Sequence, residues 1–242
     1  MTTGPTLLEL ATAWQPQRPG DRRPRDIRDA LVEPDWEGLR VVAAVDEAEA
    51  VFVREGEAVV VPDELAAAMR GAFNALGALL EGQLTTRALR SGEGVKVPSA
   101  PVERPSMIVP RALRRKDDPW VRSQEHERRA SAEAATVLAA LAGGSRHAFV
   151  ATDLLWLDGM PLDDIPLLER KRLLASVIDE AELVRVGAYV TAASVATHVT
   201  WSAMGFRELH YRAANSRYRA GEANPDCAVA PPPASIGAAT RA

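Results

Sequence analysis

The chain has 242 residues, 47% of them hydrophobic, which is enough for one sizeable core with a small appendage. The formal net charge of −4 disfavours a surface devoted to nucleic-acid binding, because such surfaces usually carry excess lysine and arginine. The single cysteine, Cys227, excludes an intrachain disulfide and a cysteine-rich zinc site, and it fits a reducing compartment. Neither a membrane-spanning run nor a signal peptide can be recognised, so we expect a cytoplasmic protein with no membrane partner.

The first half of the chain predicts an arm, a meander of strands and a helix. Residues 15–28 are rich in proline and arginine, so we expect residues 1–28 to form a mobile arm. Residues 39–61 contain three short hydrophobic runs separated by turn residues, which predicts a β-meander. A helix begins after Pro62, and its expected core residues, at helical spacing, are Leu65, Met69, Phe73 and Leu76.

The middle of the chain predicts an insertion and then a buried strand. We expect residues 91–147 to form an insertion, irregular at first and helical from about Ser123 to Leu141. Within it, residues 110–122 carry five basic side chains and Trp120, which is compatible either with a phosphate-gripping segment or with a solvated loop. The apolar run at 148–157 predicts a buried strand.

The last third predicts two helices and two strands before a tail. The helix after Pro166 is expected to pack through the inner face formed by Leu168, Leu173, Leu174 and Val177. Strands are predicted at 183–186 and 206–212, with a helix at 194–203 between them, and residues 231–242 predict a disordered tail. The histidines are scattered along the sequence without the spacing of a metal site, so no metal is predicted at His126, His147, His198 or His210.

Residues 31–40 read L-V-E-P-D-W-E-G-L-R, which closely resembles the signature E-x-K-x-D-G-x-R of ATP-dependent DNA ligases. In that family the lysine attacks the α-phosphate of ATP and carries AMP as a phosphoramidate. The resemblance places Asp35 in the position of this lysine. A carboxylate cannot form a phosphoramidate, and an acyl-adenylate on it would be prone to hydrolysis. The resemblance therefore implies a ligase-like protein without the family's nucleophile.

Two further matches follow in the family's order. Residues 148–174 resemble the run F-D-L-L-Y-L-D-G followed by P-L-x-x-R-R-x-x-L, and residues 205–221 resemble G-x-E-G-x-x-x-K-x-x-x-S-x-Y-x-x-G. The resemblance implies an α+β fold of the ligase-type nucleotidyltransferase (adenylation) class over residues 29–230, with antiparallel sheets packed against helices. We expect no oligonucleotide-binding barrel domain after it.

The resemblance also carries over individual positions. The positions that correspond to nucleotide contacts are Trp36, Glu37, Arg40, Arg54, Glu81 and Arg212. Gln83 and Arg207 stand where the family has acidic metal ligands, and Thr152 stands where an aromatic ring stacks on adenine. These replacements remove metal ligands, a stacking ring and the nucleophile together. Adenylation chemistry needs those groups to hold Mg²⁺ and to offset phosphate charge, so no catalytic residue and no metal site are expected.

The favoured hypothesis is a catalytically inactive, DNA ligase-like protein with a residual nucleotide- or nucleic-acid-binding role, or a scaffold role, in DNA repair. ATP and Mg²⁺ are cofactors only by resemblance. The expected partners are ATP or other phosphate anions, DNA bound weakly, or an active repair protein. Two alternatives stay open: an active ATP-dependent ligase or nucleotidyltransferase that uses a different nucleophile, and a regulatory subunit of an active ligase.

Overall fold

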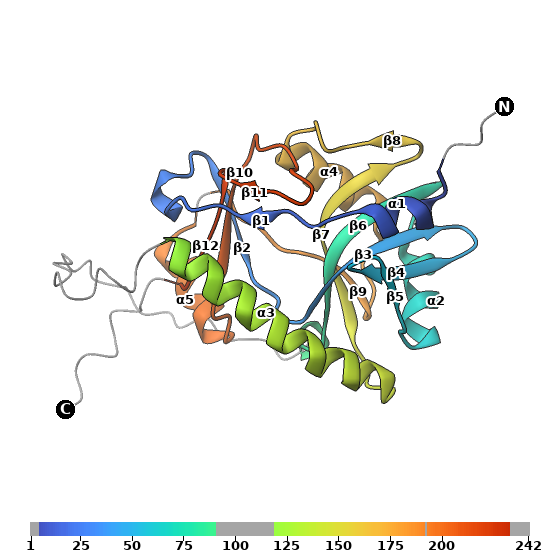
Figure 1. Cartoon of the computed structure of the whole chain (residues 1–242). Coiled ribbons are helices and arrows are strands. Elements are labelled where there is room, and N and C mark those ends of the chain that lie inside the picture. Colours follow the sequence, from blue (N-terminus) through green and yellow to red (C-terminus); the bar gives the residue numbers. More distant parts are fainter. Residues whose placement is uncertain (1–4, 91–118, 192, 233–242) are drawn as a thin grey trace, which may run out of the picture.

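The computed structural model describes residues 5–90, 119–191 and 193–232. The fold is α+β, as predicted, with a large and a small sheet, a short strand pair, and helices packed around them (Figure 1). The helices are α1 (Leu7–Ala13), η1 (Pro24–Asp26), α2 (Asp63–Ala72), η2 (Arg87–Arg90), α3 (Pro119–Ala142), α4 (Leu167–Val177) and α5 (Val195–Ala203).

The large sheet has seven strands in the order β5-β4-β3-β6-β7-β8, with β9 paired in parallel to β7. Its strands are β3 (Leu39–Asp46), β4 (Ala50–Arg54), β5 (Glu57–Val59), β6 (Gly77–Thr85), β7 (Ala148–Leu157), β8 (Met160–Pro161) and β9 (Val184–Val186). The small sheet has the order β12-β10-β2, with strands β2 (Ala30–Pro34), β10 (Leu209–Ala213) and β12 (Cys227–Ala230). A short parallel pair joins β1 (Arg18–Pro19) to β11 (Ala223–Asn224).

The predicted meander is confirmed by the antiparallel hairpins β3-β4 and β4-β5. Alternate residues of β3 face opposite sides of the large sheet, as the period of a strand requires. Val41 and Val45 join the main core with α2 and α4, whereas Val42 and Ala44 pack in a second core with α1. The sheet is therefore covered on both faces, which explains the nearly unbroken apolar run in β3.

The expected mobile arm is instead packed on the domain in residues 5–28. Helix α1 begins at a capping box formed by Thr6 and Glu9, and Ala11 is fully buried against the large sheet. The segment after α1 crosses the molecule as β1 (Figure 1), and the side chain of Gln17 accepts a hydrogen bond of 2.9 Å from Asn224. The ring of Trp14 also packs against that of Tyr218, with centroids 5.3 Å apart, and local composition does not reveal such partners.

The buried faces of two helices, α2 and α4, differ from the sequence expectation. Leu65, Met69 and Phe73 are buried as predicted, but α2 ends at Ala72 and Leu76 is 82% exposed. Helix α4 buries Leu174 and Val177 as predicted, and it also buries Arg170 and Lys171, which the apolar pattern did not include. Charged residues can occupy an inner face only where opposite charges meet them, and that is the case here.

The other predicted elements are confirmed by β7, β9, β10 and α5, and the helix of the insertion is α3. The irregular part of the insertion, residues 91–118, lies outside the described residues, as do residues 233–242 of the expected tail. Among the helices of the described ranges, none combines the length and the apolar character needed to cross a membrane.

Candidate functional site

A pocket with a volume of about 370 Å³ lies between the two sheets, and α3 and the segment around Gln17 also line it. We call it the central pocket. The large sheet contributes side chains from β3, β4, β6 and β7, and the small sheet contributes them from β2, β10 and β12. Helix α3 passes across this side of the molecule (Figure 1). The pocket thus joins segments from both ends and the middle of the chain.

The motif at 31–40 enters the central pocket because β2 leads directly into β3 through a tight turn. Glu33 and Asp35 are two residues apart and therefore face the same side of the extended chain. Strand β10 pairs antiparallel to β2 and brings His210 opposite Glu33. Glu37, which has φ of 46°, and Gly38 then turn the chain into β3, where Arg40 pairs with Gln83 on β6.

Asp35 is 8% exposed and has polar neighbours on several sides. Its Oδ1 accepts hydrogen bonds from Gln83 Nε2 at 3.0 Å and from the Glu37 backbone N–H at 3.3 Å. The ring nitrogens of His126 and His210 each lie 3.8 Å from its carboxylate. Burial alone would raise the pKa of Asp35, but the two histidines and Gln83 hold it below its usual range. Asp35 is therefore an ionised carboxylate at neutral pH.

His126 reaches the central pocket from α3. Its Nδ1 lies 2.6 Å from Glu208 Oε2, and Glu208 is also paired with Arg129 of α3 at 2.9 Å. Burial lowers the pKa of His126, but the hydrogen bond to Glu208 and the charges of Asp35 and Glu208 outweigh burial and raise it. These polar contacts hold α3 over the pocket.

Arg40, Arg54 and Arg212, which line the central pocket, and Arg207, which does not, all have carboxylate partners. Arg40 Nε donates to Glu81 Oε1 at 2.7 Å, and Glu81 also accepts from the Tyr218 hydroxyl. The remaining pairs are Arg54 with Glu55 at 2.8 Å, Arg207 with Glu37 at 3.3 Å, and Arg212 with Glu33 at 2.7 Å. An anion entering the pocket would compete with these internal partners, which lowers the affinity expected for phosphate.

The buried charges beneath the central pocket form one connected network. Arg212 joins Glu33 to Asp153, Arg170 binds both oxygens of Asp153 at 2.8 and 2.9 Å, and Lys171 Nζ lies 2.6 Å from Glu33. Burial alone would raise the pKa of Asp153, but Arg170, Arg212 and Lys171 lower it to about 2. The network fixes β2, β7, β10 and α4 relative to one another.

The six predicted nucleotide contacts all line the central pocket, although most are engaged within the fold. Trp36 packs edge-on against Phe206 with ring centroids 5.3 Å apart, so it serves core packing as well as the pocket wall. Glu37 lies 2.6 Å from Arg87. Thr152 also lines the pocket, where its hydroxyl donates to the backbone oxygen of Glu81 at 3.3 Å.

The sequence interpretation missed the grouping of His126, His210 and Asp35, whose ligand atoms all lie within 4.8 Å of one another. It also missed Glu208, which contacts His126. Three of these residues come from distant segments, so no local spacing connects them. The sequence holds only one weak indication that His210 faces the central pocket. His210 and Arg212 are two residues apart on β10 and therefore share a face of that strand.

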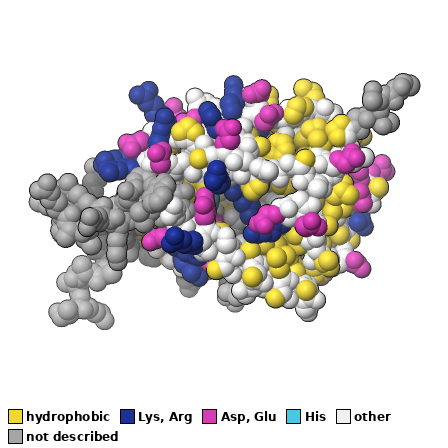
Figure 2. Space-filling model, viewed as in Figure 1, with side chains coloured by type: hydrophobic (Ala, Val, Ile, Leu, Met, Phe, Trp, Pro, Cys, Tyr) yellow, Lys and Arg dark blue, Asp and Glu magenta, His cyan; other side chains and the backbone are white. Residues whose placement is uncertain are grey.

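Charge on the face drawn in Figure 2 is mixed. Dark blue basic side chains and magenta acidic side chains alternate across it, and hydrophobic side chains gather mainly on one side. This view shows no continuous basic patch of the kind that follows a phosphate backbone. The pattern agrees with the paired arginines of the central pocket.

No protein-family model matches the chain, and comparison with curated proteins gives no match. Solved structures do match. The chain is similar to the ligase domain of LigD from M. tuberculosis, with a TM-score of 0.52 and 17% identity over 89% of this chain and 58% of that one. It is also similar to mycobacterial DNA ligase D complexed with ATP and MES, with a TM-score of 0.54 and 17% identity over 89% and 59% of the two chains.

The fold is that of a DNA ligase nucleotidyltransferase domain. This confirms the fold class expected from the three motifs, although identity at this level establishes the fold alone. The chain spans less than three fifths of each of these two ligase structures. Within the ligase-type fold, the motif at 31–40 lies at the central pocket, where Asp35 occupies the position that the sequence resemblance gives to the lysine.

Proposed function

We propose that the chain is a DNA ligase-like protein that does not form a lysyl-adenylate. In this proposal it acts in DNA repair by binding a nucleotide, DNA or an active repair protein. The observation that carries this proposal is Asp35, an ionised carboxylate at the motif position of the ligase nucleophile. Its negative charge would also repel the α-phosphate of ATP. Two mycobacterial ligase structures share the fold, and one of them is complexed with ATP, which makes the central pocket the natural place to test for nucleotide.

No described lysine can replace Asp35 as the nucleophile. Lys171, the single lysine in the described ranges, is 1% exposed, and its Nζ is held by Glu33 at 2.6 Å. Burial lowers the pKa of this amine despite the opposing charge of Glu33, but Lys171 does not line the central pocket, so the amine does not reach a nucleotide bound there. A binding role is therefore favoured over a catalytic role for this chain. Because the arginines of the central pocket are already paired, a scaffold or protein-binding role is favoured over tight nucleotide binding.

The protein is expected to remain unlabelled when it is incubated with α-labelled ATP and Mg²⁺ and then run on a denaturing gel. The reason is that neither Asp35 nor buried Lys171 can carry a stable phosphoramidate. An active ATP-dependent DNA ligase treated in the same way serves as the positive control. A label that resists hydroxylamine but is released by acid would identify a lysine adduct and contradict the proposal.

The variant Asp35→Lys extends this experiment to nick sealing. We expect no sealing, because Gln83 and Arg207 still stand at the positions where the ligase motifs carry acidic metal ligands.

In the labelling experiment, a hydroxylamine-sensitive label on the unaltered protein would indicate an acyl-adenylate on Asp35. That outcome would support the alternative of an active nucleotidyltransferase with a different nucleophile.

Binding of ATP is expected to be weak, in the micromolar to millimolar range, independent of Mg²⁺ and reduced by salt. Arginine binds phosphate without a metal, but Arg40 and Arg212 are already paired with Glu81 and Glu33, which limits the affinity. Calorimetric titrations of chelator-treated protein at low and moderate salt, with and without Mg²⁺, measure this directly. A requirement for Mg²⁺ would show that a ligase-type metal site survives.

A further inference from the structure

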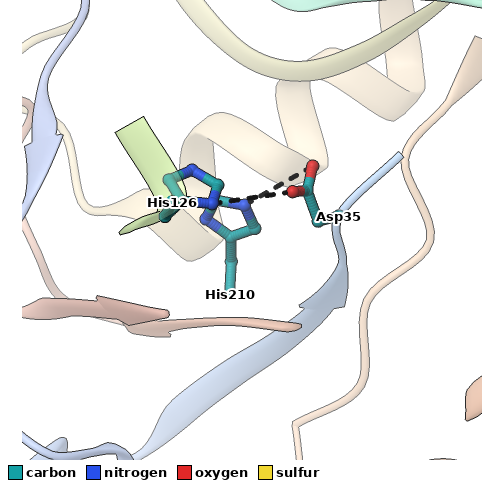
Figure 3. A group of neighbouring side chains, drawn as sticks. All are labelled: Asp35, His126 and His210. Atoms are coloured by element: carbon teal, nitrogen blue, oxygen red, sulfur yellow. Dashed lines mark ion pairs between the residues drawn. The ribbon is translucent and has the colours of Figure 1, made fainter. Parts of the chain in front are cut away.

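Three potential metal ligands converge at the edge of the central pocket (Figure 3). Asp35 follows the end of β2, His126 lies on α3 and His210 lies on β10, and their side chains point toward one another. The side chains of the two histidines are 15% and 27% exposed, and that of Asp35 is 11% exposed. Two imidazoles and one carboxylate from three separate elements are a compact ligand set at a pocket wall.

The spacing of these groups fits a shared cation better than direct hydrogen bonds. Each imidazole nitrogen lies 3.8 Å from the nearer Asp35 oxygen, beyond the usual length of a hydrogen bond. Zn–N and Zn–O bonds of about 2.0–2.1 Å in a tetrahedron place neighbouring ligand atoms about 3.3 Å apart. The two imidazole nitrogens approach different oxygens of Asp35, and the ligand atoms of the three residues lie within 4.8 Å of one another, so side-chain rotations that bring these atoms to about 3.3 Å place all three around one ion.

Neighbouring groups already contact two of the three ligands, Asp35 and His126. Gln83 holds Oδ1 of Asp35 at 3.0 Å, and the Asp35 backbone N–H donates to the Glu208 backbone oxygen at 3.0 Å. The Glu208 carboxylate lies 2.6 Å from Nδ1 of His126, and Arg129 holds its other oxygen at 2.9 Å. A partner such as Gln83 fixes the orientation of a metal ligand in known sites, whereas the Glu208 carboxylate lies close enough to Nδ1 of His126 to take part in binding an ion. The alternative to a metal is that His126 and Glu208 simply form an ion pair that docks α3.

We infer that Asp35, His126 and His210 bind a divalent transition-metal ion of the Zn²⁺ class, with a Glu208 oxygen as the fourth ligand. Nδ1 of His126 cannot hydrogen-bond to Glu208 and bind the ion at the same time, so the Glu208 carboxylate moves onto the ion. Imidazole ligands favour zinc and its neighbours over Mg²⁺. This site goes beyond the proposed function and does not depend on it.

Two consequences follow from where the ligands originate. The ion restores a positive charge at the motif position that has lost its lysine. It also fastens α3 to β2 and β10, so that the helix stays over the central pocket. Binding of the ion therefore stabilises the folded chain by linkage, because an unfolded chain does not hold the three ligands together.

The test is a calorimetric titration of the chelator-treated full chain with Zn²⁺, and with Mg²⁺ for comparison. We expect one Zn²⁺ per chain and no measurable Mg²⁺ binding. The variants Asp35→Asn, His210→Gln and Glu208→Gln each remove a ligand, and each is expected to weaken Zn²⁺ binding by at least about 100-fold, more than the loss of about 10–100-fold that an outer partner causes. The matched control is His198→Gln, because His198 lies on α5 outside this group and its replacement is expected to leave the affinity unchanged.

A second measurement does not depend on comparing affinities. With Co²⁺ as the probe, the unaltered protein is expected to show the visible absorption of a four-coordinate site, and His210→Gln is expected to lose it. The inference is overturned if the unaltered chain binds no Zn²⁺, or if Asp35→Asn and His210→Gln bind it as tightly as His198→Gln does. Equal affinity in Glu208→Gln would remove Glu208 from the ligand set.

Discussion

Replacing Asp153 by alanine is expected to lower the free energy of unfolding at neutral pH by about 3–5 kcal/mol. Asp153 is 0% exposed, and its carboxylate binds Arg170 through both oxygens and Arg212 at 2.9 Å. Its removal leaves the guanidinium of Arg170 buried without a carboxylate partner. Breaking a buried pair costs much more than the pair itself contributes, because the remaining charge keeps its desolvation penalty.

Urea unfolding of the unaltered protein and of Asp153→Ala measures this loss, and the control is Glu169→Ala on α4, the helix that carries Arg170. Glu169 pairs with Arg172 on the surface, where the two side chains are 48% and 61% exposed. Removal of this exposed pair is expected to cost under about 1 kcal/mol. A loss for Asp153→Ala as small as the loss for Glu169→Ala would show that Asp153 does not hold the network together.

The cost of Asp153→Ala should also depend on pH. Burial alone would raise the pKa of Asp153, but Arg170, Arg212 and Lys171 hold it at about 2, below the ordinary value of 3.8. A carboxyl whose folded-state pKa is lowered stabilises the protein above its unfolded pKa and loses that contribution as pH falls through the folded pKa. The difference between the two proteins is therefore expected to narrow as pH falls from about 4 toward 2.

Replacing Gly38 by alanine is expected to destabilise the protein by about 3 kcal/mol. A Cβ at this position would lie 2.3 Å from the backbone oxygen of Leu84 and 3.1 Å from Cβ of Thr85. The φ angle of +156° adds strain for any residue with a side chain. Because Leu84 lies within β6, its backbone cannot move away without disturbing the large sheet. The motif glycine thus lets the turn after Asp35 pass close to β6.

The matched control for Gly38→Ala is Gly71→Ala in α2. A Cβ at Gly71 meets no atom within 4 Å, and the exchange of glycine for alanine in a helix is expected to add about 0.5–1 kcal/mol of stability. Thermal and urea unfolding of the two variants should move in opposite directions. Unfolding of Gly38→Ala at the same urea concentration as the unaltered protein would show that the turn relaxes freely.

The variant Asp153→Ala also bears on the central pocket. The network around Asp153 holds β2 and β10 through Glu33 and Arg212, and these two strands bring Asp35 and His210 together. A partly loosened network is therefore expected to weaken any ligand binding at the pocket before the domain unfolds. The effect arises because the ligands are positioned by strand pairing rather than by local sequence.

The sequence by itself predicts the fold class and most of the helices and strands between Leu39 and Ala213, but it predicts neither α1 and β1 in the arm nor β6 in the large sheet. The apolar runs of β3, β4 and β7 indicate buried strands directly, and Pro62 and Pro166 mark helix starts because each is the N-cap residue just before its helix. The three motifs then indicate a ligase-type nucleotidyltransferase fold, and the resemblance predicts that Asp35 is the altered position because it interrupts a dense local pattern.

Tertiary structure alone decided the partners of the charged and titratable residues. Arg170 and Lys171 resemble surface residues of an amphipathic helix in the sequence, yet they are buried because Asp153 and Glu33 lie opposite them. His126 was one of several scattered histidines until α3 placed it beside Asp35. Periodicity reports how a side chain is buried relative to its own element, but it carries no information about which distant element provides the opposite charge or the next ligand.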